Sequence, residues 1–268
     1  MNRKRKVSAV FTMLLLGVVL LFSGGCTNDV NPKTTTYGLK AADVLGITGT
    51  VTFVQTSPTV TTVNITLTGA AAGVHPAQLC MNTVVEGGNV IVILNPVNVN
   101  GTSSTAITTM TYAQLIAYNG FIKVLQSDQD NKIILAQGDI GGNVLTTASK
   151  SYPLTTIGTY AVAGNALFEK RQNGNTLVTI SLNGLIAGIN YDATINLGSI
   201  ASIGGGPVVE TLNKVDGTTG KSFTNISELD SKLAITYDNW LVYDGYINVY
   251  QTKVGDGVVI SHGNIGSN

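Results

Sequence analysis

Short segments in which apolar and polar residues alternate recur along the chain. Residues 63–67, VNITL, and 178–182, VTISL, both follow the period of a strand with one buried face. Residues 90–94 are instead continuously apolar, which is the pattern of a strand covered on both faces. Asn-Gly and Asp-Gly pairs, which supply the backbone conformation of tight hairpin turns, lie between many such segments. The pattern predicts short strands joined by tight turns, as in a β-sandwich or barrel.

Two segments carry helical rather than strand signals. Thr111 and Gln114 have the spacing of a capping box, and Leu115 and Ile116 follow them. The second segment, residues 236–241, also begins with a threonine but has a weaker cap. We therefore expect one short helix in each half of the chain, ending before the next Asn-Gly or Asp-Gly pair.

The second half of the chain repeats the first. The segment TYAQLIAYNGFIKV at 111–124 matches TYDNWLVYDGYINV at 236–249, and QGDIGGN at 137–143 matches HGNIGSN at 262–268. These late segments are 125 positions apart. Three earlier residues recur after only 115 positions: Tyr37, Gly49 and Phe53 correspond to Tyr152, Gly164 and Phe168. The second copy therefore contains about ten additional residues.

The length of the repeat indicates two domains. Each copy is long enough to bury its own core, and two copies are too few for a solenoid. We expect two tandem all-β domains, at 37–143 and 152–268. The linker is expected at 144–151, and it is short enough for the domains to touch.

The N-terminus has the features of a secretory signal. Residues 3–6 are basic, residues 7–22 are apolar, and three small residues precede Cys26. This order resembles a bacterial lipoprotein signal, in which the cysteine is acylated and becomes the mature N-terminus. We expect residues 1–25 to be removed, a lipid on Cys26 to tether the protein to a membrane, and residues 26–36 to form a flexible tether. Ordinary cleavage with a free Cys26 is the alternative.

Charge and cysteine content limit which partners and which disulfides are expected. Removal of the signal leaves eleven Lys and Arg against fifteen Asp and Glu, a net charge of −4, with no basic cluster. Nucleic acid is therefore not expected as a partner. If Cys26 is acylated, Cys80 is the only other cysteine, and no intramolecular disulfide forms. By resemblance to other lipoproteins, Thr27 after the cysteine favours the outer membrane or the cell surface.

The order of several motifs in the first copy resembles a CHRD domain, a family named from chordin and widespread in bacterial secreted proteins. The motifs are His-Pro-Ala at 75–77, EGG at 86–88, NPV at 95–97, the TYAQLIAYNGFIKV segment and AQGDIGGN at 136–143. The resemblance covers most of 37–143 and, more weakly, 152–268. It implies two Greek-key β-sandwich or barrel domains of immunoglobulin-like type, distantly similar to Cu/Zn superoxide dismutase. It implies no settled biochemical activity.

Histidines that the family commonly carries are replaced in this chain. A His-x-His pair usually follows Pro-Ala, but Gln78 and Cys80 hold those places here, and the second copy has Thr194 and Asn196. A zinc or copper site needs three or four converging donors, and the chain has only two histidines. His75, Gln78 and Cys80 form a partial set of ligands for Cu(I). The alternative interpretation is a histidine at a turn and a small buried cysteine.

Signals for catalysis are weak. The sequence has no G-x-S-x-G elbow, and its carboxylates, such as Asp128, Asp130 and Asp139, are interpreted as solvated loop residues. Aromatic residues gather in the repeated segments, either as core packing or as a sugar- or protein-binding face. The aromatic residues concerned are Tyr112, Tyr118, Tyr237, Trp240, Tyr243 and Tyr246.

These features together predict a non-catalytic, lipid-anchored protein of the bacterial cell envelope that needs no cofactor. Its expected role is binding or structural, with a protein or a polysaccharide as the ligand. The alternative is a copper- or other metal-binding protein of dismutase-like ancestry. The sequence leaves the identity of the partner and the oligomeric state open.

Overall fold

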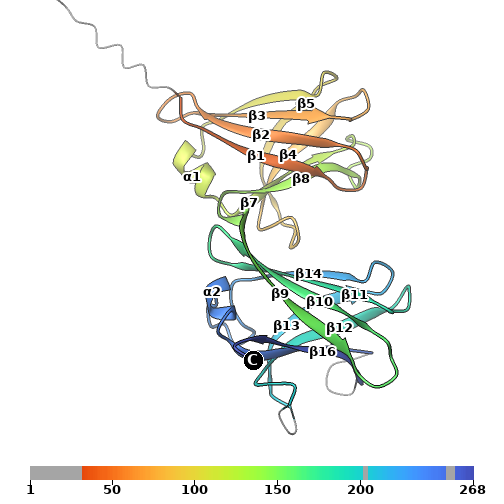
Figure 1. Ribbon diagram of the computed structural model, residues 1–268. Coiled ribbons are helices and arrows are strands. Elements are labelled where there is room, and N and C mark those ends of the chain that lie inside the picture. The colour runs from red at the N-terminus through yellow and green to blue at the C-terminus, as the bar shows by residue number, and fades with distance from the viewer. Residues whose placement is uncertain (1–31, 202–204, 252–256) are drawn as a thin grey trace, which may run out of the picture. The chain divides into compact units, whose positions relative to one another are not determined.

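The computed structural model describes residues 32–201, 205–251 and 257–268, and Pro32–Asn268 form one compact unit (Figure 1). Cys26 and the expected signal lie outside the described residues. The end of the expected tether is instead a strand, because β1 begins at Thr34. Neither α-helix of the described ranges is long and apolar enough to cross a membrane.

The first domain is almost entirely β-structure. Its elements are β1 (Thr34–Ala41), β2 (Thr48–Gln55), β3 (Thr61–Thr68), β4 (His75–Met81), β5 (Val90–Val97), β6 (Thr102–Ile107), α1 (Tyr112–Ala117), β7 (Gly120–Leu125), β8 (Ile134–Ile140) and the 3-10 turn η1 (Gly141–Asn143). All strand pairs are antiparallel, and the sheet order is β5-β4-β7-β8-β1-β2-β3-β6. Because β6 lies beside β3 rather than beside β5, the strand before it in the sequence, β3 to β6 form a Greek key.

The second domain repeats this arrangement element by element. Its elements are β9 (Leu145–Thr156), β10 (Ala163–Arg171), β11 (Thr176–Asn183), β12 (Asn190–Leu197), β13 (Val208–Asp216), β14 (Lys221–Ile226), α2 (Tyr237–Trp240), β15 (Asp244–Tyr250) and β16 (Val259–Gly266). The strands close into a barrel in the order β13-β12-β15-β16-β9-β10-β11-β14, which is the order of the first domain. The prediction of two tandem Greek-key β domains, each with a short helix, is therefore confirmed.

The repeat extends to individual hydrogen bonds where the first and last strands of each sheet meet. In the first domain Asn95 N–H donates to Thr105 Oγ1 at 2.8 Å, and the Asn95 amide donates to the carbonyl of Ser104. In the second domain Asn213 N–H donates to Thr224 Oγ1 at 2.9 Å, and the Asn213 side-chain amide donates to the carbonyl of Phe223. Side chains thus join the two edges where the backbone ladder is interrupted.

Each domain has its own core, and the two cores are built alike. Tyr37 packs edge-on against Phe53, with ring centres 5.7 Å apart, and Tyr152 packs in the same way against Phe168 at 5.3 Å. Both phenylalanine side chains are fully buried. The residues that recur in the sequence are therefore residues of the core.

The helix starts follow the predicted capping boxes. Thr111 Oγ1 accepts from Gln114 N–H, and the Gln114 side chain accepts from Thr111 N–H. Thr236 and Asn239 make the same reciprocal pair in the second domain, although the sequence showed a weaker signal there.

Two local expectations need correction. Residues 144–151 were expected to be a linker, but all except Val144 belong to β9, which pairs with β10 along its length. Residues 90–94 were expected to be covered on both faces, but Val90, Ile91 and Ile93 are 41%, 43% and 80% exposed. The strand β5 lies at the edge of its sheet and has β4 as its only neighbouring strand, so its side chains are less covered than those of a central strand.

Most of the additional residues of the second copy lie at one place. Thr105 and Thr224 are 119 positions apart, whereas Thr111 and Thr236 are 125 apart, so six residues are inserted between β14 and α2. Residues 227–235 occupy this connection, and we call them the inserted segment.

Candidate functional site

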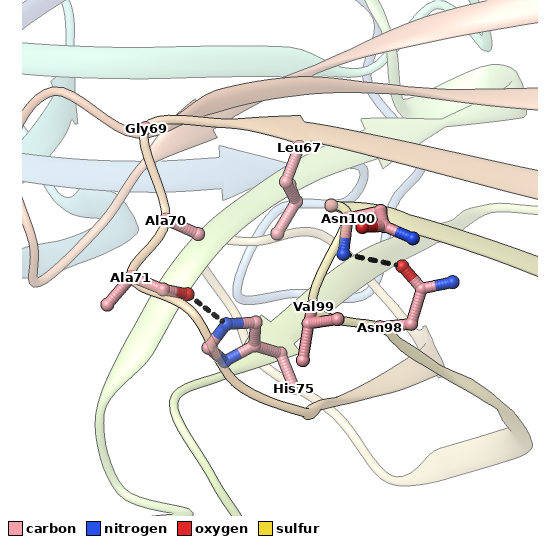
Figure 2. Close-up of a pocket in the computed structure, with 9 residues that line it drawn as sticks. Leu67, Gly69, Ala70, Ala71, His75, Asn98, Val99 and Asn100 are labelled. Carbon is pink, nitrogen blue, oxygen red and sulfur yellow. Dashed lines mark hydrogen bonds between the residues drawn. The ribbon is translucent and has the colours of Figure 1, made fainter.

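His75 is held by two carbonyl groups at the start of β4. Its side chain is buried, its Nδ1 lies 2.7 Å from the carbonyl oxygen of Gln126, and its Nε2 lies 3.0 Å from that of Ala71 (Figure 2). Carbonyl oxygens only accept hydrogen bonds, so a ring nitrogen that carries a proton donates to the carbonyl that it faces. The adjoining cavity, about 190 Å³, is lined mainly by backbone and short side chains of the loops before β4 and after β5. His75 thus ties two loops together.

The other two candidate metal ligands lie elsewhere on β4. Side chains alternate along a strand, so Gln78 and Cys80 occupy the face opposite Ala77 and Leu79, which are core residues. Cys80 is fully buried, and this burial raises the pKa of its thiol. Within the described ranges, no three His, Cys, Asp or Glu residues come together as a metal-binding group.

Most of the predicted aromatic cluster is core. Tyr237 and Trp240 belong to the core of the second domain, and Trp240 contacts the rings of Phe168 and Tyr243. Tyr112 is likewise buried in the first domain. The packing interpretation of these residues is therefore confirmed, and they do not form an exposed binding face.

Arg171, the last residue of β10, is the only buried lysine or arginine among the described residues. Its guanidinium is fully buried; Nη1 donates to Asp139 Oδ2 at 2.7 Å and also to the carbonyl of Asn143. Its Nε donates to Asn225 Oδ1 at 2.7 Å. Its Nη2 is buried and has no hydrogen-bond partner among the described residues. Arg171 therefore connects strands of both domains and keeps the two N–H donors of Nη2 unused.

Asp139 is not the solvated loop residue expected from the sequence. It lies on β8, where one oxygen pairs with Arg171 and the other accepts from the N–H of Val84 at 2.7 Å. Asp128 and Asp130 do lie exposed in the loop after β7. Sequence reasoning missed Arg171, although one signal was present: it is the only arginine beyond residue 25.

Two cavities lie beside this charge pair. The first, about 540 Å³, is lined by residues of both domains, among them Tyr37, Lys40, Asp139, Arg171 and Phe223. The second, about 490 Å³, is lined by Lys214, Lys221, Ser222 and three residues that also line the first: Val84, Val85 and Phe223. Because they share these residues, we treat the two cavities as one site and call it the junction groove.

The junction groove is richer in positive charge than the chain as a whole. Four cations line it: Lys40, Arg171, Lys214 and Lys221. The only acidic residue of the lining is Asp139, which is paired with Arg171. Outside the lining, Asp192 lies 3.0 Å from the amino group of Lys214. Since the chain beyond residue 25 carries a net charge of −4, this excess favours an anionic ligand at the groove.

Comparison with protein-family models, with curated proteins and with solved structures gives no match for this chain.

Proposed function

We propose that this protein is a non-catalytic binding protein of the bacterial cell envelope, anchored through a lipid on Cys26, and that its junction groove binds an acidic polysaccharide. The anchor follows from the lipoprotein-like signal in the sequence. The CHRD-like motifs agree with a secreted, two-domain β protein, and they carry no argument about the ligand.

One observation supports the ligand most strongly. Arg171 is fully buried, lines the groove, and has an Nη2 without a partner among the described residues. A buried donor that lacks a partner costs about 1–3 kcal/mol, and more when it is charged. A carboxylate in the groove lies in the field of this buried charge, and it would form a charge-assisted hydrogen bond with Nη2 once the side chains that cover Nη2 move aside.

The rest of the groove favours a polysaccharide over a small free carboxylate. Its two cavities meet at Phe223, a residue that is 43% exposed and whose ring offers an apolar surface on which a sugar ring stacks. Lys40 lines one cavity, whereas Lys214 and Lys221 line the other. Cations spaced on both sides of an aromatic ring fit a chain with carboxylates on successive sugars.

Isothermal titration of residues 27–268 with tetragalacturonate tests this proposal, with the uncharged galactose tetramer as the control ligand. We expect binding of the acidic oligomer alone, weakening as salt increases because exposed charges are screened. Equal binding of both oligomers, or binding of neither, would contradict the proposal.

Substitutions then locate the binding site. Lys40→Gln and Lys221→Gln each remove one charge that lines the groove, and each is expected to weaken binding about threefold to fivefold. Lys132→Gln is the matched control, because this lysine is exposed in the loop between β7 and β8 and does not line the groove. An equal loss in all three variants would mean that the oligomer binds through general charge rather than in the groove.

A further inference from the structure

The strand β5 leaves one side of its backbone unpaired. It pairs with β4 only, and its other side is an edge of the sheet. Asn95 turns its N–H and C=O away from β4, toward Thr105 and Ser103 of β6. Backbone groups alternate in direction along a strand, so those of Ile93 point to the same open side. From Val90 to Ile93, no strand of the described residues covers this side.

The second domain shows how the same edge is covered when it is not left open. Val209 of β13 corresponds to Ile91 of β5, since Asn213 corresponds to Asn95. The carbonyl of Val209 accepts from the N–H of Asp230 in the inserted segment at 3.2 Å. The hydroxyl of Thr211 also donates to the Asp230 carboxylate at 2.8 Å. The first domain lacks the six inserted residues, so its chain turns directly into α1.

The residues of the open edge are more apolar than their counterparts in the covered one. Positions 90–94 read VIVIL in β5, whereas positions 208–212 read VVETL in β13. Ile93 is 80% exposed, whereas its counterpart, Thr211, donates a hydrogen bond to Asp230 of the inserted segment. Proteins protect open edges with charges, prolines or a covering loop, and residues 90–94 contain neither a charge nor a proline.

We propose that the open edge of β5 pairs antiparallel with β5 of a second copy of this chain, forming a symmetric dimer. A two-fold axis beside Val92 places Ile93 of each copy opposite Ile91 of the other, so the segment VIVIL is complementary to itself. The outward backbone groups of the two strands then complete a ladder, and the exposed isoleucines lose their contact with water. This inference rests on the sheet edge and is independent of the ligand of the junction groove.

Sedimentation equilibrium of residues 27–268 across the micromolar range tests the proposal. We expect a reversible monomer–dimer equilibrium that Ile93→Lys shifts toward the monomer by at least about tenfold in Kd, since the symmetry introduces the lysine twice. Leu45→Lys is the matched control: Leu45 is 90% exposed in the loop between β1 and β2, and its replacement should leave the equilibrium unchanged. Circular dichroism checks that both variants are folded.

Hydrogen exchange gives a second measurement that needs no variant. Amide exchange in residues 90–94 should slow as the wild-type concentration rises through the dimer Kd. A wild type that stays monomeric would overturn the proposal, as would a dimer that both lysine variants weaken equally. A monomer whose β5 edge instead binds a synthetic peptide of residues 227–235 would assign the edge to a foreign strand and would also overturn it.

Discussion

Replacing Glu210 by glutamine is expected to stabilise the protein above neutral pH and to leave its stability unchanged in acid. Glu210 lies on β13, its side chain is almost fully buried, and its Oε2 has no partner among the described residues. Burial, reinforced by the negative charge of Asp230, raises the pKa of this carboxyl from 4.5 to about 7.

The size of the effect follows from this change in pKa. In the unfolded chain the carboxyl loses its proton near pH 4.5, whereas in the folded protein it keeps the proton until about pH 7. The folded protein therefore binds more protons than the unfolded chain within this window, and its free energy of unfolding falls as pH rises. Each pKa unit corresponds to about 1.4 kcal/mol, so the loss between pH 4.5 and about 7 is about 3 kcal/mol.

Urea unfolding of wild type and Glu210→Gln at several pH values measures this difference. The two free energies should agree below pH 4.5, and the variant should be more stable by about 3 kcal/mol above pH 7. Asp128→Asn serves as the control, because Asp128 is an exposed carboxyl of the first domain and is not among the groups that shift the pKa of Glu210; the pH-dependent gain of Glu210→Gln should be absent from this variant. A difference between wild type and Glu210→Gln that is the same at every pH would refute the reasoning.

Three further predictions concern the charge pair, the anchor and the metal alternative. Asp139→Asn leaves the fully buried Arg171 without its counter-charge, so urea unfolding should show a loss of about 3–5 kcal/mol, and an unchanged stability would be inconsistent with the buried pair. Metabolic labelling with a palmitate analogue should mark the wild type but not Cys26→Ser, and a label that persists in the variant would place the lipid elsewhere. Cu(I), Cu(II) and Zn(II) added to residues 27–268 are expected to bind without defined stoichiometry; tight binding that disappears in His75→Ala and Cys80→Ser would support the copper alternative instead.

Two kinds of feature could be predicted from the sequence: contacts between residues that are close in the chain, and positions that recur in both copies. The capping box of Thr111 and Gln114 spans three positions, so its spacing is visible without knowledge of the tertiary structure. The Tyr37–Phe53 pair is not local, but its recurrence as Tyr152 and Phe168 marks it as structural.

The exposure of β5 is beyond reach of the local pattern. A continuous apolar run is common to a central strand and to an unprotected edge strand, and only the neighbours of the strand distinguish them. In this chain the inserted segment contacts β13 in the second domain, whereas the first domain has no such segment beside β5. This difference lies far from β5 in the sequence. The expected linker at 144–151 was placed wrongly for a related reason, because β9 begins directly after η1.

The junction groove could not be assembled from sequence motifs. Lys40, Asp139, Arg171 and Phe223 come from four different strands, and the topology of both domains is needed to bring them to one site. Arg171 corresponds to Thr56 in the first copy, at the offset of 115 residues that relates Phe53 to Phe168, so the repeat does not mark this charge.

A structure of residues 27–268 with bound tetragalacturonate tests the proposed function most directly. The account predicts a carboxylate within hydrogen-bond distance of Arg171 Nη2 and a sugar ring against Phe223. An oligomer bound elsewhere on the protein, or one that leaves Arg171 Nη2 without a partner, would contradict it.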